Sequence, residues 1–493
     1  MMSLEEVMRG ESDAGDADMV ACVNSFERGS VQIAWATLRM GQRVAVLRRA
    51  RHLLAGRVDA LCGAISPELA RNDADTMVAE VLPLLAACQF LEQEAAGVLA
   101  TRRLGRRRLP FWLRDVDAEV QRVALGRVLV IGPGNYPLFL PGVQALQGLA
   151  AGNAVVWKPG RGGRAVAEVF AGTMREAGLP EGLLRVTDES VEAAEGEIAA
   201  GVDKVFFTGS AATARILLKR LAETLTPCVV EASGCDAVVV LPSADVERVV
   251  KALVFGMRLN GSATCMAPRR VVMVRASEAR RAELVGHLLT QLDWVGGVRL
   301  AGGVRRQLDE LLDAAVRDGA QVHGEQDDEQ QPIVVTNVRP EMELARADVF
   351  APVLIIMDVG GVDDAVAAVE ACPYGLTVAV FGEEREARAL GGRLTVGTVV
   401  VNDLIVATAD PRVPFGGRKQ SGFGVTRGAE GLLEMTAVKV LSVRKGKGVR
   451  QYEATTAGHA HLFRGAIRAA HGGTVKEWWR GLMAVVKAGR RMK

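Results

Sequence analysis

The chain has almost no net charge, no zinc motif and no closely paired cysteines. Its 493 residues carry 60 basic and 58 acidic side chains, a formal net charge of +2 that creates no overall field for nucleic acid. The seven cysteines are widely spaced, without a C-x-x-C pair or a cysteine–histidine cluster of zinc spacing. An odd number of scattered cysteines indicates a reducing compartment and argues against a structural metal.

The sequence also has no run of eighteen apolar residues and no leader of the secretory kind. Its first twenty residues, MMSLEEVMRGESDAGDADMV, are acidic where a signal peptide would be basic and then apolar. The basic run over residues 102–108 lacks interleaved aromatic residues. It is more typical of a solvent-exposed connection between elements than of a nucleic-acid site. We therefore expect a cytoplasmic protein without a nucleic-acid partner.

The length of the chain exceeds what one ordinary hydrophobic core accommodates, so two or three domains are expected. From about residue 31 to residue 99, apolar side chains recur at helical spacing, which predicts several packed helices. Residues 109–124, by contrast, have the pattern of an extended segment. No internal repeat interrupts this order.

The character of the sequence changes at Gly126. The segment GRVLVIGPGNYPLFLPGVQALQGLAAGNAVVWKPG predicts a strand, a glycine-rich turn, a helix and a second strand, which is one βαβ unit. The dinucleotide fingerprint G-x-G-x-x-G begins at Gly132 and Gly134 but has Pro137 in its third glycine position. The usual phosphate-binding turn is therefore absent, and the unit is not a classical Rossmann motif.

A carboxylate and a thiol frame the most informative stretch of the chain. The residues before and after Glu231 predict a short buried strand, a turn, a second apolar strand over residues 237–241 and a helix that begins near Asp245. An Asn-Gly pair then breaks the helical pattern and leaves Cys265 on a loop. The thiol is thus presented as a candidate nucleophile, although a single cysteine is more often a core residue.

This pattern, E-x-x-G followed by a strand, a helix and N-G-x-x-x-C, resembles the signature of the aldehyde dehydrogenase superfamily. The segment P-G-N-Y-P around Asn135 is similar to the family's P-x-N-[FY]-P, with Gly134 where the family usually has tryptophan. The likeness covers roughly residues 31–445. In the family the cysteine attacks the aldehyde, the glutamate activates water and the asparagine amide points at the substrate oxygen. The resemblance therefore implies Cys265, Glu231 and Asn135 as catalytic residues.

The resemblance also implies an α/β fold and its division. We expect a Rossmann-like cofactor domain, an α/β catalytic domain and a small β oligomerisation arm, assembled as a homodimer or homotetramer. The expected ranges are 1–108 and 126–230 for the NAD(P)-binding domain, 231–425 for the catalytic domain, 109–125 and 426–445 for the arm, and 446–493 for a basic C-terminal extension.

A cofactor site for NAD or NADP follows from the same likeness. Lys158 stands where the family's adenosine-ribose lysine stands. Arg161 stands near the place of a ribose-binding glutamate. Because arginine can pair with a 2′-phosphate but cannot accept from a 2′-hydroxyl, we expect NADP to be accepted at least as well as NAD. The remaining expected contacts are Gly209 and Ser210 at the pyrophosphate, where a plain serine N-cap is equally consistent, and Asp348 and Phe350 at the nicotinamide end.

Each step of aldehyde oxidation then has a candidate group. Cys265 would form a thiohemiacetal and then a thioester, with the Asn135 amide and the Cys265 backbone N–H holding the oxyanion. The nicotinamide would take the hydride, and Glu231 would activate water against the thioester. The apolar flanks of Glu231 favour the raised pKa that such a base needs.

Other functions remain open at this point. One is a CoA-acylating aldehyde dehydrogenase or acyl-CoA reductase of the same fold, against which Glu231 argues, because a reaction that avoids water has less use for a base. Another is a non-catalytic, membrane-associated or scaffold member with a decayed site. The departures from the family's pattern suggest it: Gly134 replaces tryptophan, Ala214 and Ala351 replace glycine, and Asp348 replaces glutamate. A Cys-His hydrolase is the weakest, since no motif supports it. The sequence does not identify the aldehyde.

The last thirty residues are basic and amphipathic, with eight lysines or arginines against one acid. Apolar residues at helical spacing predict a helix over residues 474–489. This helix would either pack on its own or a neighbouring subunit, or bind the inner face of an anionic membrane peripherally, which would favour long-chain, lipid-derived aldehydes. Its apolar face comprises Val475, Trp478, Trp479, Leu482, Met483, Val485 and Val486.

Overall fold

The computed structural model describes residues 30–105, 107, 109–110, 113, 115–324, 329–445, 452 and 454–491. The expectations for the acidic N-terminus lie outside these residues. The chain divides into two compact units, one formed by Met1–Arg102 and Val120–Lys439 and the other by Arg103–Glu119 and Val440–Lys493. This division does not test the finer division expected from the sequence, which stays a prediction.

A six-stranded sheet forms one part of the first unit, in the order β17-β7-β6-β3-β4-β5. The five strands from β7 to β5 are parallel, and the short β17 adds to the edge in antiparallel orientation. The predicted βαβ unit is confirmed as β3, α7 and β4. The bounds are β3 (Arg127–Ile131), α7 (Phe139–Ala151), β4 (Ala154–Lys158), β5 (Leu184–Val186), β6 (Lys204–Gly209), β7 (Cys228–Ala232) and β17 (Gly422–Phe423).

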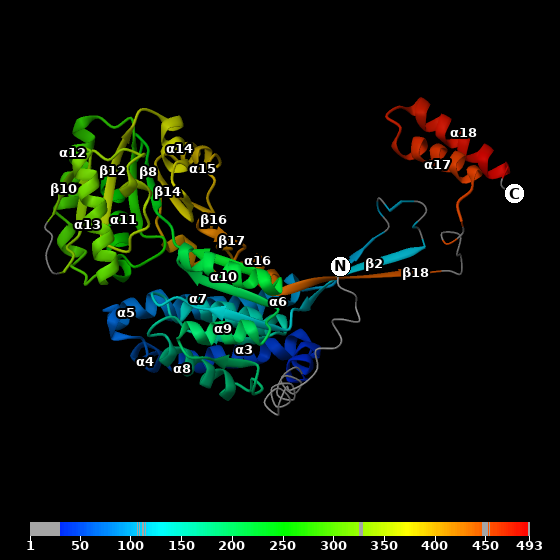
Figure 1. Cartoon of the computed structure of the whole chain (residues 1–493), viewed down its shortest axis with the longest axis horizontal. Coiled ribbons are helices and arrows are strands. Elements are labelled where there is room, and N and C mark those ends of the chain that lie inside the picture. The colour runs from blue at the N-terminus through cyan, green and yellow to red at the C-terminus, as the bar shows by residue number, and fades with distance from the viewer. Residues whose placement is uncertain are drawn as a thin grey trace, which may run out of the picture. The chain divides into compact units, whose positions relative to one another are not determined.

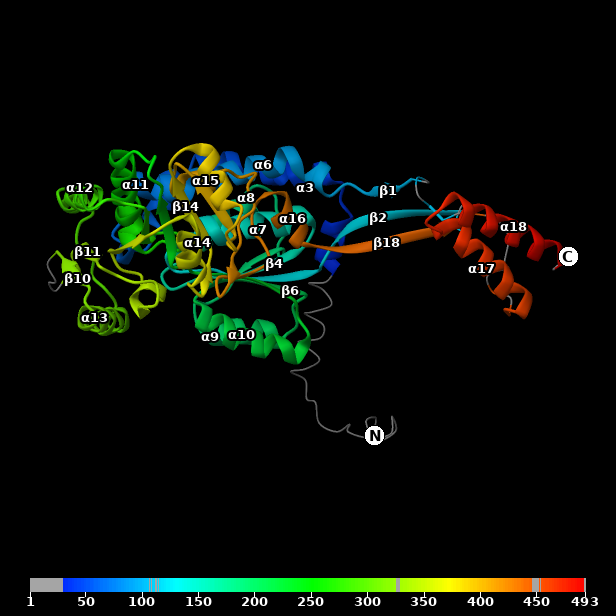
Figure 2. The same ribbon diagram turned by 90° about the horizontal axis from the view of Figure 1, so that it is seen from above.

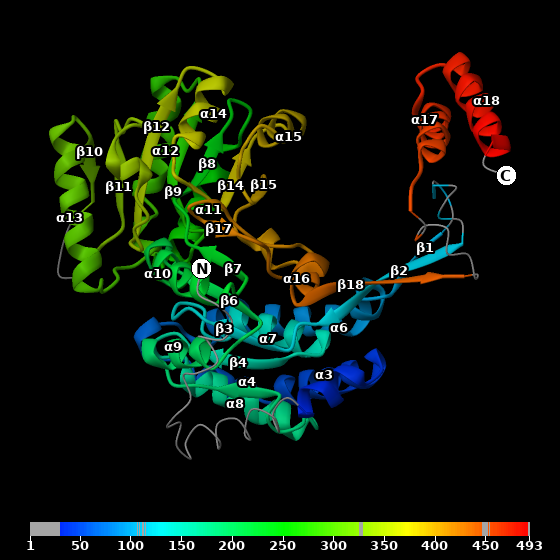
Figure 3. The ribbon, with the colours of Figure 1, turned by 45° about the vertical axis from the view of Figure 1, so that its right-hand side comes forward.

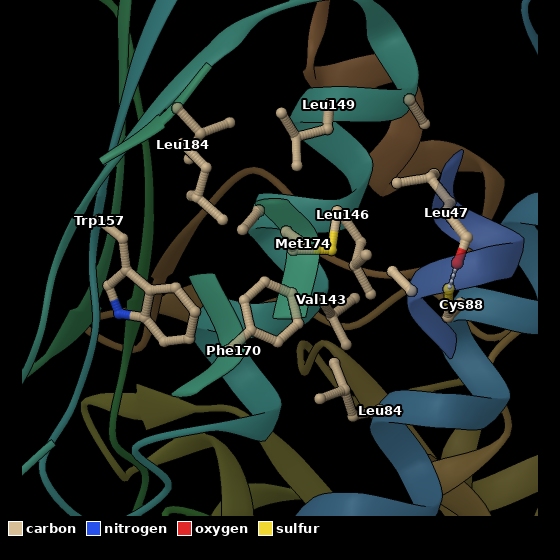
Figure 4. Close-up of a cluster of buried hydrophobic side chains, with 14 of the residues drawn as sticks. Leu47, Leu84, Cys88, Val143, Leu146, Leu149, Trp157, Phe170, Met174 and Leu184 are labelled. Atoms are coloured by element: carbon tan, nitrogen blue, oxygen red, sulfur yellow. Dashed lines mark hydrogen bonds between the residues drawn. The ribbon is translucent and has the colours of Figure 1, made fainter. Parts of the chain in front are cut away.

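Helices cover both faces of this sheet, and most residues of its parallel strands are accordingly apolar. Figure 2 shows α9 (Val191–Ala199) and α10 (Ala211–Thr224) on one side. The other side carries α3, α6, α7 and α8, whose side chains form a large core with β4 (Figure 4). The remaining bounds are α3 (Met40–Ala55), α4 (Val58–Gly63), α5 (Asp73–Thr76), α6 (Leu82–Val98) and α8 (Arg164–Glu176).

The helical segment Asp73–Val98 is long and apolar enough to cross a membrane by length and composition alone. It consists of α5, one π-helical turn over Met77–Val81 and α6. Leu84 and Cys88 on α6 are fully buried in the core of Figure 4, where the Cys88 thiol donates to the Leu47 carbonyl at 3.5 Å. We therefore assign the segment as a core helix.

A seven-stranded sheet forms the other part of the first unit, in the order β10-β11-β12-β9-β8-β14-β15, with only β10 antiparallel (Figure 3). Helices α11 and α12 cover one face, and α13, α14 and α15 cover the other. The bounds are β8 (Asp236–Val240), α11 (Val246–Arg258), β9 (Pro268–Val274), α12 (Glu278–Leu289), α13 (Gly302–Arg317), β10 (Gln321–His323), β11 (Ile333–Thr336), β12 (Val353–Val359), α14 (Val362–Glu370), β14 (Thr377–Phe381), α15 (Glu384–Gly391) and β15 (Thr398–Val401). Two mainly parallel sheets with helices on both faces confirm the α/β prediction.

Short elements connect these layers. The strands β13 (Tyr374–Gly375) and β16 (Arg418–Lys419) pair in antiparallel orientation, and α16 (Gly428–Glu434) follows the glycine-rich segment around residue 424. The Ser421 hydroxyl donates a hydrogen bond to the Ser233 carbonyl at 3.0 Å. The segment that contains residues 421–428 is therefore held next to the end of β7, where Glu231 lies.

The second unit contains most of a three-stranded sheet and a helical hairpin (Figure 1). The strands are β1 (Arg102–Leu104), β2 (Val116–Ala124) and β18 (Thr436–Arg444), in the order β1-β2-β18. The helices are α17 (Ala457–His471) and α18 (Val475–Arg491), so the predicted C-terminal helix is confirmed. A Cβ at Gly465 would lie 2.8 Å from the Val485 nitrogen, which shows how closely the two helices pack.

Candidate active site

Glu231 lies near the end of β7 and is buried, with 2 % of its surface exposed. β7 lies between β6 and β17, where Glu231 is opposite Thr208 and Gly422. Its Oε2 accepts from the Thr426 hydroxyl at 3.2 Å, whereas its buried Oε1 has no hydrogen-bond partner among the described residues. Burial raises the pKa of this carboxyl, as the sequence suggested, and Arg427 partly opposes the rise.

Cys265 lies on the loop that follows α11. Asp245 caps this helix by accepting from the backbone N–H groups of Glu247 and Arg248, and the helix ends at Arg258. The chain then turns through left-handed φ angles at Asn260 and Gly261, the pair predicted to break the helix. The loop leaves Cys265 partly buried, and burial, followed by the charge of Glu231, raises the pKa of its thiol.

Glu231 and Cys265 line the same cavity, which has a volume of about 130 Å³. An engineered apolar cavity of roughly 150 Å³ holds benzene, so the space suits a slender apolar group. Apart from the thiol, the carboxylate, one guanidinium and a few hydroxyls, most of the wall is hydrophobic. It includes Val78, Phe139, Phe255, Leu259, Ile405 and Phe415.

Asn135 lies between β3 and α7, beside the cysteine loop. Its side-chain Nδ2 donates to the Ala263 carbonyl at 2.8 Å, and its own carbonyl accepts from Asn260 Nδ2 at 3.1 Å. The residue that reaches the cavity wall from this segment is Tyr136, whose hydroxyl lies 2.9 Å from Thr264 Oγ1. The structure thus ties the predicted asparagine to the nucleophile's loop, with one amide hydrogen engaged by backbone.

A buried ion pair that the sequence analysis missed supports this arrangement. Arg71 Nη1 lies 2.7 Å from Glu80 Oε1, and both side chains are essentially unexposed, at 3 % and 0 %. Arg71 also donates to Asn260 Oδ1 at 2.7 Å and to the Asn135 carbonyl. Glu80 accepts from the backbone N–H of Phe139 at 2.7 Å, at the start of α7. The sequence signal that could have revealed this ion pair was the Glu80 carboxylate inside an otherwise apolar helical turn.

Arg427 is another residue that the sequence analysis missed. Its guanidinium carbon lies 4.3 Å from the centre of the Phe415 ring and 5.6 Å from that of Phe139, and its side chain lines the cavity. Nη1 donates to the Thr408 carbonyl at 2.6 Å. An arginine in a glycine-rich loop resembles a solvated surface residue, so no signal in the sequence pointed to it.

The predicted ribose-binding residues lie around the end of β4 and the start of α8. Lys158 ends β4 and is partly buried, which lowers the pKa of its ammonium group. Glu189, which the sequence analysis also missed, accepts from the backbone N–H groups of Gly162 at 2.9 Å and Arg164 at 2.8 Å. The Arg161 side chain is 87 % exposed and lies 3.5 Å from a carboxylate oxygen of Glu68.

The other predicted cofactor residues lie at strand and helix ends of the two sheets. Ser210 caps α10 by accepting from the Thr213 N–H at 3.1 Å, directly after Gly209 ends β6. Asp348 accepts from the Ser233 hydroxyl through Oδ2, while its buried Oδ1 has no partner among the described residues. A lysine near carboxylates, a helix N-terminus and an unpartnered carboxylate oxygen suit the ribose and phosphate groups of a dinucleotide. The residues present therefore fit NAD or NADP.

No group of three or more potential metal ligands occurs in the described part of the chain. Phe350, the last of the predicted cofactor contacts, packs beside Arg269, whose guanidinium carbon lies 5.9 Å from the centre of its ring. The donor set of the site thus consists of a thiol, carboxylates, an amide and arginines.

Comparisons with known proteins identify the family of the chain. The family described as "Aldehyde dehydrogenase family" matches residues 3–441. The chain is 30 % identical over 450 residues to benzaldehyde dehydrogenase [NAD(+)] of Pseudomonas putida, covering 85 % of this chain and 87 % of that protein. It is 29 % identical over 415 residues to 4,4'-diapolycopene aldehyde oxidase of a Methylomonas species, covering 82 % of this chain and 78 % of that protein.

Solved structures show the same relationship. The crystal structure of Mycobacterium tuberculosis aldehyde dehydrogenase complexed with NAD+ superposes with a TM-score of 0.75 and 26 % identity, covering 84 % of this chain and 88 % of that one. The aldehyde-dehydrogenase-like fold that the sequence predicted is confirmed. The chain belongs to the aldehyde dehydrogenase family, whose members oxidise aldehydes to carboxylic acids with NAD or NADP.

Proposed function

We propose that this aldehyde dehydrogenase oxidises slender apolar aldehydes, with Cys265 as nucleophile and Glu231 as general base. The observation that supports this proposal most is the shared cavity, whose largely hydrophobic wall contains both the thiol and the carboxylate. An unpartnered carboxylate oxygen on Glu231 has a free lone pair for a proton of either the thiol or a water molecule.

In the first half of the reaction, Glu231 accepts the proton of the Cys265 thiol, and the sulfur attacks the aldehyde carbon. The resulting alkoxide accepts hydrogen bonds from the Cys265 backbone N–H and the second amide hydrogen of Asn135. Bound NAD or NADP supplies the acceptor for the hydride that leaves this carbon. A thioester on Cys265 remains.

In the second half, the proton that Glu231 took from the thiol first leaves to solvent. Glu231 then takes a proton from water while the water oxygen attacks the thioester carbon. The carbon–sulfur bond breaks, the Cys265 thiolate leaves, and the carboxylic acid departs. Coenzyme A as the acyl acceptor is the alternative, but it makes no use of a buried base next to the sulfur. Omitting and adding coenzyme A in the same steady-state assay separates the two acceptors.

The proposed substrate class rests on the wall and mouth of the cavity. Val78 and Val406 line the cavity and are also 63 % and 56 % exposed, so hydrophobic surface continues from the interior to solvent. An aldehyde whose apolar body is longer than the cavity would bury more surface there, at about 25 cal/mol per Å². The names of the two relatives above give benzaldehyde and 4,4'-diapolycopene aldehyde as their substrates.

The test is a comparison of kcat/KM across short and long aliphatic aldehydes, benzaldehyde and a semialdehyde that carries a carboxylate, each with NAD and with NADP. We expect kcat/KM to rise with apolar length and to be lowest for the charged compound. A preference for the semialdehyde would overturn the proposed substrate class while leaving the family assignment intact.

We propose in addition that the chain is cytoplasmic, forms a homodimer or homotetramer, and contacts the inner face of an anionic membrane through α18. This helix packs on α17 with small residues, Gly481 and Ala488, which are buried. The face away from α17 exposes Trp479 and Met483, at 55 % and 62 %. The basic side chains form a flank that borders this apolar face.

The positions of the charges support an anionic lipid surface as the occupant of this face. Lys476, Arg480 and Lys487 each follow an apolar residue of the exposed face by one position, about 100° around the helix. Glu477 is the only acid among the described residues of the two helices. Interfacial binding combines tryptophans that insert into the lipid with basic residues beside them. Each basic residue contributes roughly 1 kcal/mol near an anionic surface.

Vesicle co-sedimentation of the full-length protein tests the membrane contact. We expect binding to anionic vesicles that falls with salt and is lost in the Trp478→Ser, Trp479→Ser double variant. The matched control is Trp294→Ser, which removes an exposed tryptophan from the first unit. Equal sedimentation of both variants and the wild type would assign the hairpin to protein packing. Equal binding to neutral vesicles would contradict the role given to anionic lipid.

A further inference from the structure

The cavity contains one cationic side chain among its described lining residues, and this is Arg427. Only 4 % of the residue is exposed. Its Nη1 donates to a backbone carbonyl, and its buried Nε has no hydrogen-bond partner among the described residues. A guanidinium that is removed from water without a bonded carboxylate is uncommon, because an uncompensated charge is costly to bury.

The backbone holds Arg427 in an unusual conformation. Its φ of 61° and ψ of 170° lie in a region that side chains rarely adopt and glycine adopts readily. The Phe415 and Phe139 rings flank the guanidinium, and the Thr408 carbonyl fixes one of its nitrogens. A strained residue persists only where its surroundings fix it, and here they direct the charge into the reaction cavity.

The reacting groups lie among acidic neighbours. Burial raises the pKa of the Cys265 thiol, and the nearby carboxylates raise it further, because each disfavours a second negative charge. Arg427 lowers the pKa of both Cys265 and Glu231 relative to burial alone. The titratable groups around the thiol are Glu231 on β7, Asp236 on β8, Asp348 before β12, Tyr136 before α7, Arg269 on β9 and Arg427 before α16.

We propose that Arg427 is the counter-cation of this active site, a positioning residue that keeps Cys265 and Glu231 ionisable inside an apolar cavity. The proposal rests on the roles proposed above for these two residues. When the thiol passes its proton to the carboxylate, one negative charge moves from the Glu231 oxygen to the Cys265 sulfur. Arg427 acts on both groups, so its positive charge stabilises the negative charge both before and after the proton transfer.

The pH dependence of Cys265 alkylation tests this role without cofactor or aldehyde. The rate of iodoacetamide modification at Cys265, followed by peptide mass spectrometry, reports the thiolate fraction. We expect Arg427→Met to raise the pH of half-maximal modification by about one unit or more, since an opposite charge in such a site shifts a pKa by roughly 1–3 units. Arg427→Lys should restore much of the wild-type profile.

The matched control is Arg412→Met, which removes an exposed arginine from the segment before β16. It should leave the alkylation profile unchanged. If Arg427→Met does not fold, Arg427→Gln removes the charge and keeps a hydrogen-bond donor. An unchanged profile in a folded, neutral variant would overturn the proposal, and so would an Arg427→Lys profile shifted as far as that of Arg427→Met.

A second role for Arg427 gives a different result. If the guanidinium anchors a substrate carboxylate, its removal selectively lowers kcat/KM for anionic semialdehydes and leaves the alkylation profile in place, which would also overturn the counter-cation. The proposed function fails separately. Full activity of Cys265→Ala would end the covalent mechanism, whereas the alkylation profiles still report whether Arg427 controls the ionisation of that thiol.

Discussion

At the scale of single residues, the buried pair of Arg71 and Glu80 is the most consequential contact outside the cavity. It links the π-helical turn before α6 to the start of α7 and to Asn260 and Asn135. Removing one partner of a buried pair leaves the other charge unpaired, which costs about 3–5 kcal/mol. We therefore expect Arg71→Met to lower the free energy of unfolding by that amount in urea titrations.

The exposed pair of Arg388 and Glu384 provides the control for this prediction. Arg388→Met should change the free energy of unfolding by less than about 1 kcal/mol, because solvent screens an exposed pair. Arg71→Met should also lower kcat, since Asn135 loses a contact to its carbonyl. Unfolding curves for Arg71→Met that coincide with those of the control would refute the role given to the buried pair.

The choice between NAD and NADP is predicted from Arg161, and it stays a prediction. Its exposed guanidinium is near Glu68 and has no other ion-pair partner among the described residues, so it is available to a 2′-phosphate. Glu189 lies close to Lys158 and favours a 2′-hydroxyl instead. We expect NADP to be used at least as well as NAD and Arg161→Ala to lower kcat/KM for NADP alone. A strong NAD preference that Arg161→Ala leaves unchanged would contradict this expectation.

What the sequence could predict at this scale followed from spacing. Glu231 and Cys265 belong to one continuous segment, so a strand, a turn and a helix sufficed to place them. Arg71 and Asn135 are 64 residues apart, and Arg427 is 162 residues from Cys265. Contacts of this range depend on how the sheets and helices pack, which hydrophobic periodicity does not specify.

At the scale of elements, the start of β8 contains a buried carboxylate that links two strands. Asp236 accepts from the Thr377 N–H of β14 at 3.2 Å and from its hydroxyl. Burial raises its pKa from 3.8 to about 7. Between these values the folded protein binds more protons than the unfolded chain, so the stability from this group falls as pH rises.

The Asp236→Asn variant removes this titration and keeps an acceptor for Thr377. Relative to the wild type, it should therefore become more stable as pH rises from about 5 to about 8, by at most about 1.4 kcal/mol per unit. Urea unfolding at both pH values measures the change, with Asp363→Asn on the surface of α14 as the control. The same difference between variant and wild type at both pH values would contradict the raised pKa.

The contact between α17 and α18 gives a second prediction for an element. A Cβ at Gly481 would lie 2.7 Å from the Gly465 carbonyl oxygen, whereas Gly489 on the same helix has no atom within 4 Å. Gly481→Leu should therefore separate the two helices and increase hydrogen exchange in both. Gly489→Leu is the matched control and should preserve protection. Equal exchange in the two variants would show that close packing does not hold the hairpin together.

The sequence predicted several elements to within a few residues, and the reason is local. Asp245 caps α11 with its own side chain, and Asn260 and Gly261 end it with left-handed backbone, so both limits are encoded nearby. The π-helical turn at Met77–Val81 was not predicted, because its apolar residues fit an α-helix equally well. The face of α18 that packs on α17 was also missed, since glycine and alanine carry little hydrophobic signal.

At the scale of the whole molecule, every residue assigned to the chemistry belongs to the first unit, while the second unit contains the helical hairpin. A membrane contact by the hairpin and aldehyde oxidation in the cavity are therefore separable by experiment. The Trp478→Ser, Trp479→Ser variant should keep the wild-type kcat for a short, water-soluble aldehyde while losing vesicle binding. A parallel loss of kcat in this assay would show that the hairpin is needed for the site itself.

The central claim is that Cys265 and Glu231 share one cavity as nucleophile and general base. Its most direct test uses the Glu231→Gln variant. Rapid-mixing absorbance measures the reduced cofactor that it forms, and the mass of the intact protein reports any acyl group on it. We predict a burst of about one reduced cofactor per subunit, a slow turnover afterwards and an acyl group on Cys265, because acylation survives where hydrolysis fails. Wild-type turnover in water without coenzyme A, with no acyl-enzyme detected, would contradict the account.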